Sequence, residues 1–178
     1  RKKKMTGYRE RSDKKRKVYL RLHERYVRRG KTFVYVDESG FFPYSARRYG
    51  YAPIGQRVHG LIAGKKHPRT SLIAARIGQR FEEPFLFQGT CNADVFNAWI
   101  EHQLSPHLND NHVVVMDNVS FHKGKETKDL IERTGAILLF LPPYSPDFNP
   151  IEQDFAALKT IREYNENETI DEIIRMYI

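Results

Sequence analysis

Three acidic residues lie where the sequence could support metal-assisted chemistry. Asp37 ends the run TFVYVD and Asp117 ends the run HVVVMD, and both runs predict strands. Glu152 lies in NPIEQ, just inside a predicted helix. If the two strands are parallel neighbours, their carboxylates meet at the edge where open α/β sheets bind ligands. Three carboxylates at one edge repel one another unless cations lie between them, and oxygen ligands without His or Cys favour Mg²⁺ or Mn²⁺.

Each acid also has a purely structural interpretation. An aspartate after a strand often caps the following turn through its own backbone. Asn149 can act as the N-cap of the next helix with Pro150 at its first position. Glu152 then falls at the third position, where a glutamate closes a capping box. Considered one at a time, the three acids leave both interpretations open.

The remaining elements predict an α/β domain that could bring the acids together. Strands are expected first and then alternate with helices, a pattern typical of an α/β sandwich whose central strands are buried on both faces. The predicted strands are 32–40, 57–64, 70–78, 112–118 and 136–141, and the predicted helices are 92–108, 123–135, the segment from Pro150 to about Tyr164, and 169–178. Within the helix after Pro150, Ile151, Phe155 and Leu158 form the expected buried face.

Charge is unevenly distributed along the chain. Residues 1–31 contain fifteen Lys or Arg against three acids, whereas the rest of the chain has more acids than bases. This asymmetry indicates a polyanionic partner, most simply nucleic acid, and the alternative is a solvated terminus. A helix is expected between Ser12 and Gly30, with Val18, Leu22 and Tyr26 docking on the domain. The basic residues expected to face phosphates are Lys14, Lys15, Arg16, Lys17, Arg21, Arg25, Arg28 and Arg29.

A second basic segment, SARRYGYAPIGQR at 45–57, interleaves arginines with aromatic residues. This mixture suits backbone contact and stacking on unpaired bases, although a plain hairpin loop would look similar. Its candidate DNA-binding residues are Arg47, Arg48, Tyr51 and Arg57.

Composition excludes several other classes. Cys91 is the only cysteine, which rules out an intrachain disulfide and a multi-cysteine zinc site and suits a reducing cytosol. The sequence shows no apolar run of membrane-spanning length and no signal peptide. The first residue is Arg rather than Met, so we expect a fragment or a trimmed product.

Three segments, YVDESGF, VVVMDNVSFHKG and LPPYSPDFNPIEQDFAALK, together resemble the catalytic domain of mariner-type DDE transposases, in the branch found in bacterial insertion sequences. The resemblance covers about residues 31–165, and the thirty-four residues between Asp117 and Glu152 match that branch. It implies an RNase H-like α/β fold with a mixed five-stranded sheet flanked by helices on both faces. Residues 1–31 would then be a basic arm and residues 32–178 the catalytic domain.

The resemblance also implies the chemistry. Asp37, Asp117 and Glu152 would form a DDE triad that holds two divalent ions, Mg²⁺ or Mn²⁺. The activity would be hydrolysis at transposon ends followed by transfer of the freed 3′-hydroxyl into target DNA. Asn118 and His122 could steady the metal site or contact DNA, although His122 could instead cap the helix that starts near Gly124. Asn149 is expected to be the cap that orients Glu152.

The implied partners are transposon terminal inverted repeats and target DNA, bound by a homodimer in the cytoplasm at the nucleoid. A helix-turn-helix segment that reads the repeats would be missing or supplied separately. The alternatives are another RNase H-like nuclease, such as a resolvase or an RNase H, and a domesticated remnant that binds DNA without cutting it. The NPIE arrangement after PPYSPDF favours the transposase branch, and the intact acids argue against a remnant.

Overall fold

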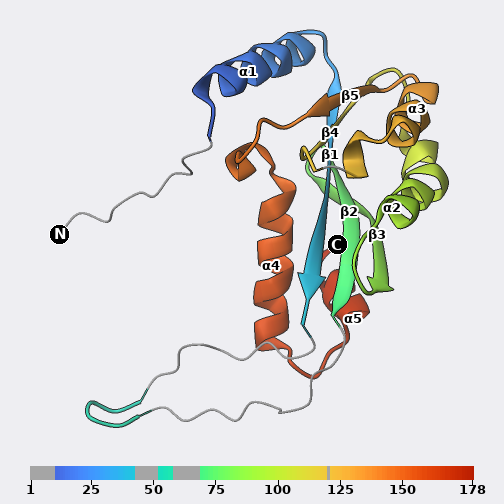
Figure 1. Ribbon diagram of the computed structural model, residues 1–178. Coiled ribbons are helices and arrows are strands. Elements are labelled where there is room, and N and C mark those ends of the chain that lie inside the picture. Colours follow the sequence, from blue (N-terminus) through green and yellow to red (C-terminus); the bar gives the residue numbers. More distant parts are fainter. Residues whose placement is uncertain (1–10, 43–51, 58–68, 120) are drawn as a thin grey trace.

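A five-stranded mixed sheet organises the computed structural model, which describes residues 11–42, 52–57, 69–119 and 121–178 (Figure 1). The strand order is β3-β2-β1-β4-β5. β1 pairs with β2, and β2 with β3, in antiparallel fashion, whereas β4 is parallel to both β1 and β5. The strands are β1 (Thr32–Phe41), β2 (Thr70–Ile77), β3 (Arg80–Gln88), β4 (His112–Met116) and β5 (Ile137–Phe140).

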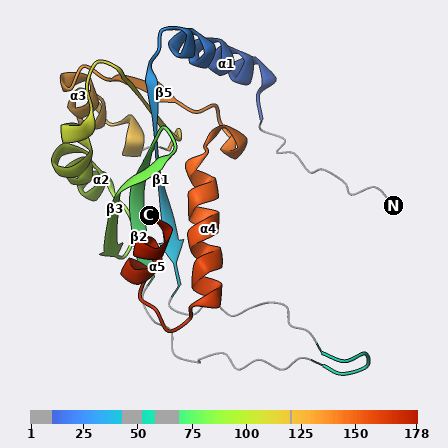
Figure 2. The same cartoon turned by 180° about the vertical axis from the view of Figure 1, so that it is seen from behind.

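Helices cover both faces of this sheet, as Figures 1 and 2 show. One face packs against α2 (Ala93–Trp99), which continues as a π-helical turn to Leu104, and against α3 (Lys125–Arg133). The other face packs against α1 (Asp13–Arg28), α4 (Ile151–Tyr164) and α5 (Ile170–Tyr177). None of the helices in the described ranges is long and apolar enough to span a membrane.

Alternation along β1 divides its side chains between the two faces. Val34 and Val36 are fully buried in the core with α2 and α3. Phe33 packs with residues of α1, and Phe41 packs with residues of α4 and α5. Asp37 and Glu38, which are successive residues of β1, therefore point to opposite faces of the sheet.

The start and end signals in the sequence explain most helix boundaries. Ser12 accepts a hydrogen bond from the backbone of Lys15 at the start of α1, and Asn92 accepts one from Val95 at the start of α2. Gly30, just after α1, has φ +69°, a conformation that a side chain would disfavour. Thr169 and Glu172 form a capping box at the start of α5.

One strand was not predicted. β3 contains Pro84 and charged residues and is only partly buried, as suits the edge of a sheet, so it lacks clear alternation. It pairs with β2 across Gly78 and Gln79. The strand predicted at 57–64 lies, apart from Arg57, outside the described residues.

The docking face of α1 also differs from the prediction. Val18 is half exposed, and the buried residues of the helix are Arg16 and Tyr19. Tyr26 packs against the sheet as predicted and Leu22 is half-buried, so the prediction is wrong for Val18 alone. Tyr19, which stacks on Phe148, takes the place predicted for Val18. Aromatic stacking, rather than the aliphatic periodicity, sets the orientation of the helix.

Packing of α4 on the sheet should dominate the stability of this half of the domain. Leu158 is fully buried in the core with Ile151 and Phe155, as predicted. Leu158→Ala should lower the free energy of unfolding by about 2–5 kcal/mol because it leaves a cavity. Lys159→Ala, at the next and exposed position, should change it by less than about 0.5 kcal/mol in the same urea titration. Equal effects of the two variants would contradict this packing.

Candidate active site

Parallel pairing of β1 with β4 brings the two aspartates together. Val36 of β1 is in register with Met116, the last residue of β4, so Asp37 and Asp117 are the residues that follow this pair. β4 ends at Met116, whereas β1 continues to Phe41. The adjacency expected from the sequence is therefore present, and the role of the two residues as metal ligands stays a prediction.

The third predicted ligand comes from the start of α4. A 3₁₀ turn, Pro146–Phe148, precedes the helix, whose N-cap is Pro150 rather than Asn149. The prediction that Asn149 caps the helix is wrong, because its side-chain Nδ2 donates to Asp37 Oδ2 at 2.9 Å. Glu152 is exposed on the first turn of α4, and α4 has no side-chain cap, so the capping-box interpretation is also wrong.

Asp37 is the centre of this group. Its Oδ1 accepts a hydrogen bond from the backbone N of Glu38 at 2.8 Å, and Oδ2 accepts the bond from Asn149. Burial raises the pKa of Asp37 to about 7, and the negative charges of Glu38, Glu152 and Asp117 act in the same direction. Asp37 is therefore partly protonated at neutral pH, and a bound cation would favour its carboxylate form.

A buried histidine joins Asp117 to a fourth acid that the sequence analysis did not single out. His122 is fully buried, with Nδ1 2.7 Å from Asp117 Oδ1 and Nε2 2.7 Å from Glu38 Oε1. Burial alone lowers the pKa of His122, but the two carboxylates outweigh it and raise the pKa to about 9. The ring is thus an imidazolium at neutral pH, and both nitrogens donate.

This bridge decides between the two interpretations of His122. It does not cap α3, whose N-cap is Gly124. Instead it fixes one oxygen of Asp117 and neutralises part of the acidic charge. The sequence did contain a sign of the role of Glu38, because this residue is a second acid directly after Asp37. Alternation along β1 places Glu38 on the opposite face of the sheet from Asp37.

Both aspartates also accept hydrogen bonds from the backbone that follows them. Glu38 N donates to Asp37, and Val119 N lies 3.4 Å from Asp117 Oδ1. The turn-capping interpretation therefore holds for Asp117 alone, because Asp37 lies within β1, which continues to Phe41. It is compatible with the site because the backbone bond uses Oδ1 of Asp117 and not Oδ2.

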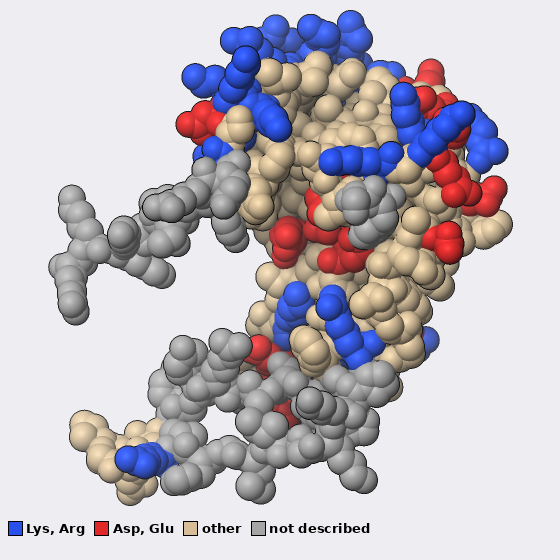
Figure 3. Space-filling view, in the orientation of Figure 1, with Lys and Arg blue, Asp and Glu red and all other residues tan. Residues whose placement is uncertain are grey.

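Acidic side chains gather in the middle of the face that Figure 3 shows, between the basic side chains around α1 and a second basic group. Within the described residues, no group of three His, Cys, Asp or Glu is arranged to hold a metal ion. The donor set still fits Mg²⁺ or Mn²⁺, because it offers carboxylate oxygens and because the Asp117 side chain is 40% exposed and Glu152 is exposed.

The other predicted residues divide into four groups. Asn118 is half-buried and makes no side-chain hydrogen bond within the described ranges. The expectation that Arg16 faces outward is wrong, because its side chain is buried against Asp147. Arg47, Arg48 and Tyr51 lie outside the described residues. The predicted DNA-binding residues that are exposed are Lys14, Lys15, Lys17, Arg21, Arg25, Arg28, Arg29 and Arg57.

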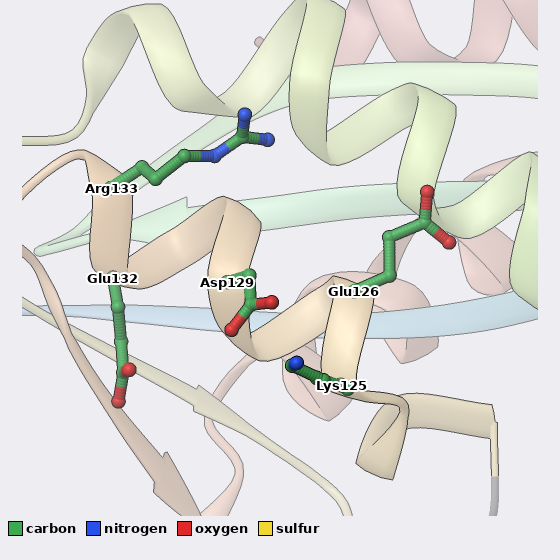
Figure 4. Close-up of a pocket in the computed structure, with 5 residues that line it drawn as sticks. All are labelled: Lys125, Glu126, Asp129, Glu132 and Arg133. Carbon is green, nitrogen blue, oxygen red and sulfur yellow. The ribbon is translucent and has the colours of Figure 1, made fainter.

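A surface hollow on α3 does not belong to this site. Figure 4 shows its lining residues, Lys125, Glu126, Asp129, Glu132 and Arg133, all from that helix. Glu126 accepts a hydrogen bond from Asn97 of α2 at 2.8 Å, so this side chain helps to join the two helices. No residue of the acidic group around Asp37 lines the hollow.

Comparison with known proteins gives a family match and structural matches. The family model described as DDE superfamily endonuclease matches residues 32–174. A Mos1 transposase paired-end complex with the left transposon end has a TM-score of 0.72 at 19% identity, covering 91% of this chain and 53% of that chain. A pre-cleavage Mos1 transpososome has a TM-score of 0.73 at 18% identity, covering 99% and 58%. A search of curated proteins found no match.

The Mos1 transposase catalytic domain with raltegravir and Mn has a TM-score of 0.62 at 14% identity and covers 97% of this chain and 82% of that chain. At such identities the likeness shows the fold, and it confirms the predicted RNase H-like arrangement. The chain spans little more than half the length of the first two matched chains.

The raised pKa of Asp37 predicts a pH-dependent stability. In the folded protein the pKa of Asp37 is about 7, whereas the ordinary pKa of an aspartate is 3.8. Ionisation of Asp37 therefore lowers the free energy of unfolding as the pH rises between these two values. In EDTA, Asp37→Asn should unfold at a higher temperature than the wild type at pH 8, and the difference should shrink toward pH 4. Asn149 can accommodate the new amide, since its buried Oδ1 has no hydrogen-bond partner among the residues that the structure describes.

The control for this prediction is Asp129→Asn, at an exposed position of α3. The difference in unfolding temperature between this variant and the wild type should stay constant over the same pH range. A flat difference for Asp37→Asn as well, or a lower unfolding temperature at pH 8, would contradict the electrostatic account of Asp37.

Proposed function

Because the chain belongs to the DDE superfamily endonucleases, we propose that it is the catalytic domain of a metal-dependent DNA transposase of the mariner type, in the bacterial insertion-sequence branch. One observation supports this most strongly. Asp37 in β1, Asp117 after β4 and Glu152 at the start of α4 lie close enough to interact electrostatically. The negative charges of Asp117 and Glu152 both raise the pKa of Asp37. Such an arrangement destabilises a protein unless it serves to bind cations.

In this proposal, Asp37, Asp117 and Glu152 would hold two Mg²⁺ or Mn²⁺ ions. When bound, the ions supply charge neutralisation at the phosphodiester and activation of water or a 3′-hydroxyl for in-line displacement. Carboxylates suit this role because they bind the hard cations and leave coordination positions for phosphate oxygens.

The surrounding residues orient the acids. Asn149 and the backbone N of Glu38 hold the two oxygens of Asp37, so the direction of this carboxylate is set before any ligand arrives. His122 donates to Asp117 Oδ1 and leaves Oδ2 for a ligand. Glu38 keeps His122 protonated by accepting at its other nitrogen, and this stabilises the orientation of Asp117.

DNA would reach the site along the basic helix α1. Seven of its basic residues, together with Arg29 just after it, were predicted to contact phosphates, and all but Arg16 are exposed. Such contacts are independent of base sequence and weaken steeply with salt. We assign residues 1–31 to an arm and residues 32–178 to the catalytic domain, and a further segment would read the terminal inverted repeats.

The proposed reaction is hydrolysis at transposon ends, followed by attack of the freed 3′-hydroxyl on target DNA. Joining two ends to one target favours a homodimer on DNA, which would act in the cytoplasm at the nucleoid. The Mos1 matches are complexes with transposon-end DNA and structures with Mn or Mg, and this similarity supports both the DNA substrate and the metal ions.

Removing the acid of α4 tests this function. Glu152→Gln should reduce cleavage of labelled DNA carrying candidate transposon ends, in Mg²⁺ or Mn²⁺, by on the order of 100-fold or more, because one metal ligand loses its charge. DNA binding in a mobility-shift assay should persist, and EDTA should abolish cleavage by the wild type.

Glu166→Gln, at an exposed position after α4, is the matched control and should cut like the wild type. Cleavage by Glu152→Gln at the wild-type rate would remove the metal role of Glu152. Cleavage that survives EDTA would exclude the metal-dependent mechanism.

A further inference from the structure

The buried face of α1 holds the turn that leads into the acidic site. Arg16 is only 8% exposed, and its guanidinium makes a bidentate contact with Asp147, with distances of 2.9 Å from Nη1 to Oδ1 and 2.6 Å from Nη2 to Oδ2. The same guanidinium lies 3.8 Å from the centre of the Phe148 ring. Tyr19, one turn further along α1, stacks on the same ring with 5.3 Å between centroids.

This contact is specific in geometry. A planar guanidinium can pair with a carboxylate through two parallel hydrogen bonds and stack on an aromatic face at the same time, which a lysine cannot do. The hydrogen bond to Asp147 raises the pKa of Arg16, and the hydrogen bond from Arg16 lowers the pKa of Asp147, so both groups remain charged. The pair joins residues 131 positions apart in the chain.

The turn that Arg16 contacts, Pro146–Phe148, is short and leads directly to the site. Within it, Phe148 N donates to the Ser145 carbonyl at 3.1 Å, and Asn149 N donates to the Pro146 carbonyl at 2.9 Å. Asn149 then reaches Asp37, and its own carbonyl accepts from the backbone N of Glu152 at 3.2 Å. A shift of the turn would therefore move Asn149 and Glu152 together relative to Asp37.

The opposite face of α1 is exposed and basic, as the blue side chains at the top of Figure 3 show. The exposed basic side chains of α1 thus face solvent, whereas Arg16 on its buried face contacts the turn that precedes Glu152. Resting on the function proposed above, we propose that Arg16 is a positioning residue, which places Asn149 and Glu152 at Asp37. The basic helix and the acidic site then form one coupled unit. Any effect of DNA bound to α1 on metal affinity must then be matched by an equal effect of the metal on DNA affinity.

Mn²⁺ binding to the 178-residue chain without DNA, measured by calorimetry, tests this role apart from activity. Arg16→Met should weaken Mn²⁺ binding by about fivefold or more, because the turn loses its anchor. Arg16→Lys should recover only part of that loss, because an ammonium cannot form the bidentate contact. Asp147→Asn should weaken binding as well, and the Arg16→Met, Asp147→Asn double variant should be no worse than Arg16→Met alone.

Two controls separate positioning from other effects. Ile173→Val in the core of α5 should lower the unfolding temperature and leave Mn²⁺ affinity unchanged. Arg21→Met on the exposed face of α1 should weaken DNA binding without changing Mn²⁺ affinity in the absence of DNA.

The outcomes distinguish this inference from the proposed function. Wild-type Mn²⁺ affinity in both Arg16→Met and Asp147→Asn would overturn the positioning role, while loss of cleavage in Glu152→Gln would still support the transposase. A wild-type chain that binds no Mn²⁺ would overturn the proposed function and this inference together. Because the Asp147 side chain is 52% exposed, Asp147→Asn keeps the test available if Arg16→Met fails to fold.

Discussion

Repulsion among carboxylates around Asp37 is the constraint on which the rest of the structure depends. Asp37 is partly buried, its charge is disfavoured by burial and by Glu38, Asp117 and Glu152, and its pKa is raised to about 7. A fold can keep such a group only if packing elsewhere compensates for it. The fully buried strand residues Val34, Val36, Val114 and Met116 provide that packing on one side of β1 and β4.

The acids are held from both faces of the sheet. On the side of α2 and α3, His122 bridges Glu38 and Asp117 and supplies a positive charge. On the side of α1 and α4, Asn149 donates a hydrogen bond to Asp37. Arg16 binds Asp147 in the turn immediately before Asn149. The site therefore depends on β1, on the segment after β4, on the turn before α4 and on α1, so the basic helix is one of the supports of the acidic group.

Much of the fold and part of the site were predictable from the sequence. The apolar runs before Asp37 and Asp117 predicted β1 and β4, because strand composition is a local property. Asp117 follows the end of β4 as predicted, whereas Asp37 lies inside β1, which continues to Phe41. Side-chain partners were not predictable, since they depend on tertiary contacts. Asn149 looked like a helix cap and instead binds Asp37, and Arg16 looked like a DNA contact and instead binds Asp147. β3 was missed because an edge strand with Pro84 lacks alternation.

The most direct test of the central claim is a crystal structure of the chain grown with Mn²⁺, with the ions located by their anomalous scattering. The account predicts Mn²⁺ bound among Asp37, Asp117 and Glu152, with His122 still bridging Asp117 and Glu38. Anomalous peaks only at other carboxylates, or Glu152 directed away from both aspartates with the metal present, would contradict it.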